Sequence, residues 1–190
     1  MLVAQILSLL YNIVDRIYIA RIPEVGTTAL GAVGLCFPII VIITAFSNLF
    51  GSGGAPLFSI NRGKGNTKKA ETIMNTSFSM MCICGVVLMV IGMLSASPIL
   101  VLFGASEEGL SYAYPYMMIY LIGTVPSMIA TGMNPFINAQ GYATSGMLSV
   151  TIGAVANLIL DPLFIFGLHL GIKGAAIATI ISQTLSAAYV

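Results

Sequence analysis

Two acidic residues lie within apolar stretches of the sequence, and they are the first candidates for chemistry. Asp161 stands in the apolar run 156–164, and no lysine or arginine lies within eleven positions of it. Asn157 is four residues earlier, so a helix would place both side chains on one face. Pro162 has no N–H to bond the carbonyl of Leu158. A carboxylate, an amide and a freed carbonyl would therefore converge, and hard cations bind oxygen ligands of this kind.

The Asp161 carboxyl is also suited to holding a proton, because an apolar medium disfavours a charged group. The structural alternative is a neutral aspartic acid that bonds locally beside a proline kink. A charge at the centre of a bilayer costs at least about 2.5–3.5 kcal/mol, and such residues mark ion pathways by default. We therefore interpret Asp161 as functional.

Asp15 is the second buried acid that the sequence predicts. Tyr11 lies four residues before it and Asn12 three residues before it, so a helix would present all three on one face. The alternative is an acid near the membrane surface that pairs with Arg16 or Arg21.

The composition indicates what kind of protein holds these acids. Of the 190 residues, 58% are hydrophobic, 20 are glycine and only 7% are charged, whereas a soluble domain has about 25% charged residues. This composition excludes a soluble enzyme and a disordered region, and the lack of a basic excess excludes a nucleic-acid partner. The chain is predicted to be an integral membrane protein whose partner is the lipid bilayer.

The gaps between charges indicate how often the chain crosses the bilayer, since a spanning helix needs about 20 apolar residues. The runs are continuously apolar rather than alternating, which favours helices over a membrane barrel. The sequence therefore predicts an all-α, polytopic membrane protein, a single bundle of six transmembrane helices. These spans are predicted at about 2–20, 29–58, 72–95, 112–139, 147–167 and 172–190.

Counting along the predicted spans places the polar residues at one depth. Asp15 is 13 residues into the first span and Asp161 is 14 residues into the fifth, roughly 20 Å from the inner face in each case. Thr179, seven residues into the sixth span, falls at about the same depth. Two nearby acids raise each other's affinity for a proton or a cation, so this layer suits cation coupling.

The basic residues predict the orientation. Four of the seven, Arg62, Lys64, Lys68 and Lys69, lie between the second and third spans. The positive-inside rule places the 61–70 loop and the N-terminus in the cytoplasm of a cell whose plasma or inner membrane holds the chain.

These pieces resemble a known family, the multidrug and toxic compound extrusion (MATE) transporters. The likeness runs over the whole chain in the family's order. Its more specific motifs are Asn157-Leu158-Ile159-Leu160-Asp161-Pro162 and Arg62-Gly63-Lys64-Gly65-Asn66, and the weaker ones are residues 11–15, 29–34, 140–141 and 171–176.

The resemblance implies a fold of two six-helix lobes and an antiporter that expels drugs and cationic amphiphilic molecules in exchange for Na⁺ or H⁺. It implies no catalytic activity and no cofactor. Carried over by motif, the cation site comprises Tyr11, Asp15, Asn157, Asp161 and Thr179, with Na⁺ expected at Asp15, Asn157 and Asp161. The family's site also has an asparagine on the fourth span, for which Asn134 is the nearest candidate, although our depth count places it closer to the cytoplasm.

Several alternatives remain at this stage. Only the N-terminal lobe of the family is present, so we expect either a fragment of a longer transporter or a half-transporter that forms dimers. The proline usual in the first span is absent, since Pro23 lies beyond Asp15. A flippase for a lipid-linked substrate would need basic residues in the cavity, and an intramembrane enzyme would need more than the lone His169. A non-functional fragment is the remaining alternative.

Overall fold

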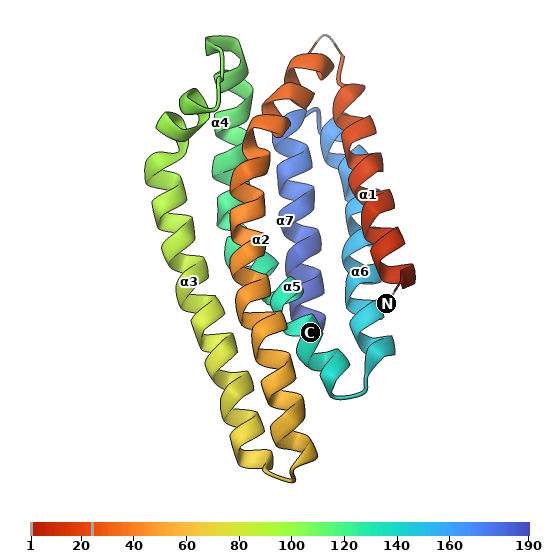
Figure 1. Cartoon of the computed structure of the whole chain (residues 1–190). Coiled ribbons are helices and arrows are strands. Elements are labelled where there is room, and N and C mark those ends of the chain that lie inside the picture. Colours follow the sequence, from red (N-terminus) through yellow and green to blue (C-terminus); the bar gives the residue numbers. More distant parts are fainter. Residues whose placement is uncertain (1, 24) are drawn as a thin grey trace.

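The chain folds as a bundle of roughly parallel and antiparallel helices, and the computed structural model describes residues 2–23 and 25–190 (Figure 1). The elements are α1 (Leu2–Ala20), α2 (Gly26–Gly63), α3 (Thr67–Leu102), α4 (Glu107–Ile122), α5 (Thr124–Ala139), α6 (Ala143–Pro162), η1 (Leu163–Gly167) and α7 (Ile172–Tyr189). No strand occurs in the described part of the chain. The all-α fold expected from the composition is confirmed.

Each of the six predicted spans corresponds to a helical segment. Among the described residues, α2, α3 and the continuous segment Ala143–Gly167 are long and apolar enough to cross a membrane, and the bent pair α4–α5 would make a fourth span. Helices α1 and α7 occupy the first and last predicted spans but are not among these candidates. Crossing by these two helices stays a prediction.

Helices α2 and α3 are longer than the spans predicted at 29–58 and 72–95, and a side-chain cap defines the start of α3. The side chain of Asn66 accepts a hydrogen bond from the backbone N–H of Lys69 at 3.2 Å, which satisfies one of the free donors at the start of α3. The polar residues that the hydropathy pattern assigned to a loop thus form the last turn of α2 and the first turn of α3.

The predicted fourth span is broken. Helices α4 and α5 meet at Gly123 with a bend of 57°. Pro126 explains the break, because a proline ring clashes with the carbonyl four residues earlier, here that of Ile122. The continuous helix expected over 112–139 is therefore wrong in this detail. A second irregularity follows Pro162, where the α-helical pattern changes to the π-helix η1.

Close contacts between small residues position the helices. Helix α2 packs against both α3 and α5, α1 packs against α6, and α6 packs against α7. A Cβ on Gly51 of α2 would collide with the backbone of Gly132 of α5, so these two backbones touch. Such contacts between small residues are typical of helices in lipid, where apolar surfaces gain little by leaving the bilayer.

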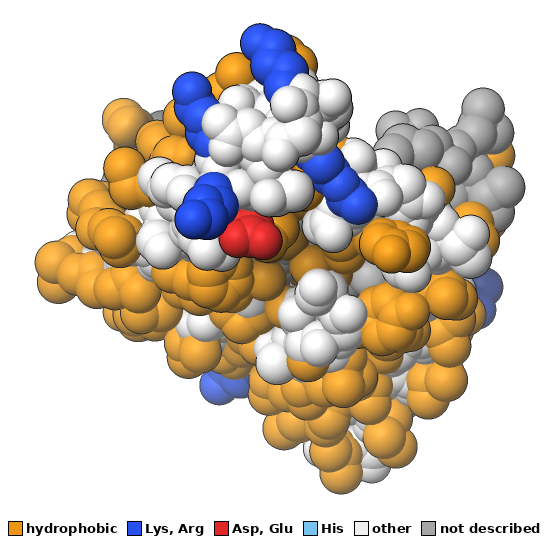
Figure 2. Space-filling view, turned by 90° about the horizontal axis from the view of Figure 1, so that it is seen from below, with side chains coloured by type: hydrophobic (Ala, Val, Ile, Leu, Met, Phe, Trp, Pro, Cys, Tyr) orange, Lys and Arg blue, Asp and Glu red, His pale blue; other side chains and the backbone are white. Residues whose placement is uncertain are grey.

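Large apolar side chains cover the outside of the bundle. Leu94 and Leu102 of α3 are each 81% exposed, and Figure 2 shows hydrophobic side chains over most of the face seen there. A surface of this kind needs hydrocarbon around it. The α2–α3 and α5–α6 turns lie at one end of the bundle and the α3–α4 and α6–α7 connections at the other (Figure 1), as the predicted alternation of loops requires.

Candidate functional site

The packing of α1 against α6 brings the two predicted acids together. Asp161 is fully buried, with 0% of its surface exposed, and Asp15 is half-buried. Their carboxyl groups are close enough to share a hydrogen bond when one of them carries a proton. The depth argument placed these residues in one layer, and the structure also places them side by side.

The oxygens of this pair are incompletely satisfied. The side-chain amide of Asn157 donates a hydrogen bond of 3.0 Å to Oδ1 of Asp161, as expected for residues one helical turn apart. Oδ1 of Asp15 and Oδ2 of Asp161 are buried, and neither has a hydrogen-bond partner within the described residues. Two ionised carboxylates can only accept hydrogen bonds. The donor set therefore fits a proton or a small hard cation held between them.

The alternative interpretation of Asp15, a surface acid paired with arginine, is not observed. The guanidinium of Arg16 lies over the ring of Phe37 on α2, 5.7 Å from its centroid. Within the described residues, Asp15 forms no ion pair with Arg16 or Arg21 at the 4.0 Å limit. Arg16 thus acts on Asp15 as a nearby charge, and the buried Oδ1 of Asp15 has no hydrogen-bond partner among the described residues.

Tyr116 of α4 is a polar neighbour that the sequence analysis missed. Its side chain is only 3% exposed and lies within electrostatic reach of both Asp15 and Asp161. Its ring stacks on that of Tyr120, with the centroids 6.3 Å apart. Nothing in the local pattern of α4 distinguishes Tyr116 from its neighbours Tyr112 and Tyr114, so only packing identifies it.

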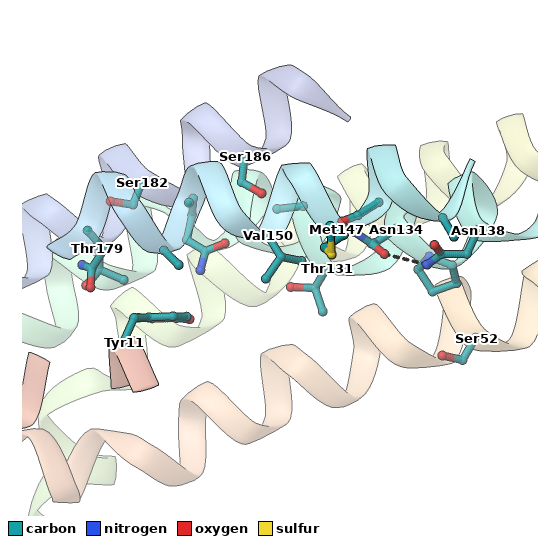
Figure 3. A pocket seen from close by; sticks show the side chains of 18 residues that line it. Tyr11, Ser52, Thr131, Asn134, Asn138, Met147, Val150, Thr179, Ser182 and Ser186 are labelled. Carbon is teal, nitrogen blue, oxygen red and sulfur yellow. Dashed lines mark hydrogen bonds between the residues drawn. The ribbon is translucent and has the colours of Figure 1, made fainter. Parts of the chain in front are cut away.

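A cavity of about 580 Å³ is lined mainly by α5, α6 and α7 and reaches Asn157, the residue that bonds Asp161 (Figure 3). None of the described residues that line it is charged, and most of the polar ones carry a hydroxyl or an amide. Its polar lining comprises Tyr11, Ser52, Thr131, Asn134, Asn138, Asn157, Thr179, Ser182, Gln183 and Ser186. A pocket of this size falls within the range of small-molecule sites.

Four of the six residues predicted for the cation site line this pocket: Tyr11, Asn157, Thr179 and Asn134. Figure 3 shows Tyr11 and Thr179 at the same end of the cavity. The hydroxyl of Thr179 donates to the carbonyl of Ala175 at 2.9 Å, so its oxygen can still accept a hydrogen bond. Because Asn157 also bonds Asp161, the wall of the pocket is continuous with the acid pair.

The structure does not bring Asn134 to the acids. It lies at the opposite end of the pocket from Tyr11 and Thr179, as Figure 3 shows. Its side-chain amide donates to the carbonyl of Gly146 at 2.7 Å and to the hydroxyl of Ser149 at 2.8 Å. It therefore ties α5 to α6, and a role for it in the cation site stays a prediction.

Comparisons with known proteins agree with this architecture. The MatE family profile matches residues 1–163. The chain is 30% identical over 186 residues to the multidrug export protein MepA of Staphylococcus haemolyticus, and 31% identical over 176 residues to an FAD transporter of Shewanella oneidensis. These matches cover 98% and 90% of the chain. A multidrug resistance MATE family transporter of the MOP superfamily, solved in an outward-facing conformation, superposes with a TM-score of 0.92 at 26% identity over 100% of the chain.

The chain spans about two fifths of the length of these relatives. It covers 41% of MepA, 38% of the FAD transporter and 41% of the solved transporter. This share is what one lobe of a two-lobed transporter would occupy.

Proposed function

Because the chain belongs to the MatE family of transporters, we propose that it is the ion-binding lobe of a cation-coupled antiporter that exports drugs. The observation that carries this proposal is the pair of buried carboxyl oxygens, on Asp15 and Asp161, that have no donor among the described residues. An acid pair of this kind inside a lipid-embedded bundle is costly unless it binds a cation or a proton.

The coupling ion in this proposal is Na⁺ or H⁺. Asp15 and Asp161 supply the negative charge, and the Asn157 amide holds one oxygen of Asp161 in place. Tyr11 and Thr179 complete the site on the side of the pocket. No group of three or more His, Cys, Asp or Glu side chains with metal-site spacing occurs in the described residues, so Na⁺ would depend on amide and hydroxyl oxygens as well.

Asn157 provides a physical route for coupling. Its side chain borders the drug-sized pocket and at the same time bonds the acid pair. A cation bound at the acids changes the hydrogen bonding of the Asn157 amide, which donates to Asp161. Because Asn157 also lines the pocket, the pocket wall that a substrate contacts changes as well. By linkage, if the cation weakens substrate binding by a given factor, the substrate must weaken cation binding by the same factor.

The lining of the pocket favours a drug over a phosphate-bearing substrate. One relative is an FAD transporter, and a flippase for a lipid-linked substrate was an alternative from the sequence. Both kinds of cargo carry phosphate, which is usually bound by arginine or lysine. No basic residue is among those that line this pocket, so a neutral or cationic molecule with apolar surface fits it better.

The proposed transporter also requires a second lobe, either from a longer chain or from a second copy. Of the six predicted site residues, Tyr11, Asn134, Asn157 and Thr179 line a cavity that is open on one side. A twofold or pseudo-twofold partner would close it. We further propose that the assembly lies in the cell membrane with the α2–α3 turn in the cytoplasm.

The test measures drug binding to the chain in detergent or nanodiscs, with and without Na⁺ and at two pH values, using a fluorescent organic cation. We expect binding to weaken when the coupling ion is added, and this dependence to disappear in Asp161→Asn. The wild type in liposomes under an imposed Na⁺ or H⁺ gradient would then report whether two copies suffice for transport.

Thr184→Ala is a matched control, because the Thr184 hydroxyl is exposed, bonds only its own helix and lies outside the pocket lining. It should keep the full ion dependence. Drug binding by the wild type that ignores both Na⁺ and pH would contradict the proposal, as would unchanged ion dependence in a folded Asp161→Asn variant.

A further inference from the structure

A cluster of four basic side chains surrounds the turn between α2 and α3, which we call the basic tip: Arg62, Lys64, Lys68 and Lys69. All four are exposed, and Figure 2 shows them spread around the tip, with one acidic side chain beside them. Within the described residues none of them forms an ion pair at the 4.0 Å limit. The basic tip thus carries a net positive charge, since Glu71 is the one acid among residues 61–72.

The basic tip lies directly next to lipid-facing surface. Leu57 and Ile60 of α2 are 54% and 52% exposed, and such side chains need hydrocarbon around them. Arg62 follows Ile60 by two residues, or about 3 Å along the helix axis. The tip projects past the α5–α6 turn, as Figure 1 shows. The four charges therefore follow directly on exposed apolar surface of α2.

Two of the basic residues occupy positions that are unfavourable for helix stability. Lys68 and Lys69 stand in the first turn of α3, where the positive end of the helix dipole disfavours cations by about 0.3–1 kcal/mol each. The side chain of Asn66 supplies the cap of this turn, so the lysine side chains are not needed to stabilise the start of the helix. The exposed ammonium groups thus add donors at a helix N-terminus, an arrangement that attracts anions.

Arg62 adds a directed group to this surface. Its guanidinium lies over the ring of Phe58, 6.0 Å from the centroid, and Phe58 is itself buried against Phe136. The contact holds the planar fork at the lipid boundary, where it can bond a phosphate with two parallel hydrogen bonds.

We propose that the basic tip is a docking surface for the phosphate headgroups of anionic phospholipids. Positive charge in this loop orients the chain during insertion; the proposal concerns what the side chains contact afterwards. An anionic leaflet offers the complementary charge, and each lysine or arginine near the membrane surface typically strengthens such binding about fivefold. The tip would thus anchor one end of the long α2–α3 hairpin.

The experiment reconstitutes the whole chain into phosphatidylcholine bilayers with trace spin-labelled phosphatidylglycerol or phosphatidylcholine. The fraction of motionally restricted label gives the relative association of each lipid. We expect the wild type to prefer phosphatidylglycerol several-fold at low salt, and this preference to fall at high salt because the charges are exposed. Lys68→Gln/Lys69→Gln should remove most of this preference, because two of the four charges are lost.

Two further variants make the test decisive. Lys68→Arg/Lys69→Arg keeps the charge and should keep the preference. Arg21→Gln/Lys173→Gln removes two exposed charges at the opposite end of the bundle, outside the four-residue cluster, and should lower the preference less than the lysine variant does. Helical circular dichroism checks that each variant folds. A quadruple glutamine variant of the tip that retains the full preference would overturn the proposal, as would an equal loss in the Arg21/Lys173 control.

Discussion

At the residue level, the two acids are held in different ways. Asp161 receives a hydrogen bond from Asn157 of its own helix, so part of its environment is local. Asp15 has a buried oxygen without a donor among the described residues and depends on α6 for its neighbourhood. The reactive feature is therefore the pair, which exists only while α1 and α6 remain packed.

A substitution at Asn134 distinguishes a role in the cation site, which the family motif implies, from a structural role in joining α5 and α6. Asn134→Ala removes three hydrogen bonds: two that its amide donates, to the carbonyl of Gly146 and to the buried hydroxyl of Ser149, and one that its oxygen accepts from the Asn138 amide. We expect a loss of about 1–3 kcal/mol of stability, because a buried polar group loses its partner. Thermal unfolding in detergent measures this loss, and the ion dependence of drug binding should persist.

Asn157→Ala is the comparison for Asn134→Ala, since Asn157 bonds the acid pair directly. It should weaken ion dependence. If Asn134→Ala instead abolished ion dependence without lowering the unfolding temperature, Asn134 would belong to the cation site after all.

At the level of elements, the crossing of α2 and α5 determines where the pocket wall stands. Helix α5 carries Thr131 and Asn134 into the cavity, and its distance from α2 is set by the contact between Gly51 and Gly132. The chain bends at Gly123, and this bend sets the direction of α5. A side chain does not fit at this position, because a Cβ there would lie 2.6 Å from Cγ1 of Ile180 on α7. Small residues thus position the segment that lines the pocket.

Gly51→Ala tests this crossing. The new Cβ would collide with the backbone of Gly132, which cannot move aside as a flexible side chain can. We expect a loss of about 1–3 kcal/mol, as for other overpacked interiors. Gly53→Ala is the matched control, because a Cβ there meets nothing within 4 Å. It should be neutral or slightly stabilising in the same unfolding measurement, and equal effects of the two substitutions would contradict the close crossing.

At the level of the whole molecule, two kinds of surface are distinguished. The outside of the bundle carries apolar side chains such as Leu94, whereas the pocket carries hydroxyls and amides such as Thr131 and Asn138. Only the second kind gains from contact with water. The molecule is thus divided into a lipid-facing surface and one wetted face.

The reactivity of single cysteine substitutions distinguishes the wetted face from the lipid-facing surface. In a background in which Cys36, Cys82 and Cys84 are replaced by alanine, Thr131→Cys should react with a membrane-impermeant maleimide in open bilayer discs. Leu94→Cys, at a position that is 81% exposed to the outside of the bundle, should react far more slowly, because lipid covers it. Equal labelling rates would show that the pocket is no wetter than the lipid-facing surface.

The sequence by itself determined the class of protein, the sites of the main helices and the pairing of Asn157 with Asp161. These properties are local: apolar runs demand helices in lipid, and residues four apart share a face. The positions of Asp15 and Asp161 at one depth also followed from counting residues along two predicted spans.

Only the tertiary structure decided which faces of the helices meet. It placed Asp15 against Asp161 rather than in an ion pair with Arg16, added Tyr116 to their surroundings and assigned Asn134 to the junction of α5 and α6. It also showed that the fourth predicted span is broken at Gly123. The physical reason is that the rotation of a helix about its own axis depends on the side chains of both packed partners. A periodic pattern in one segment cannot specify that rotation.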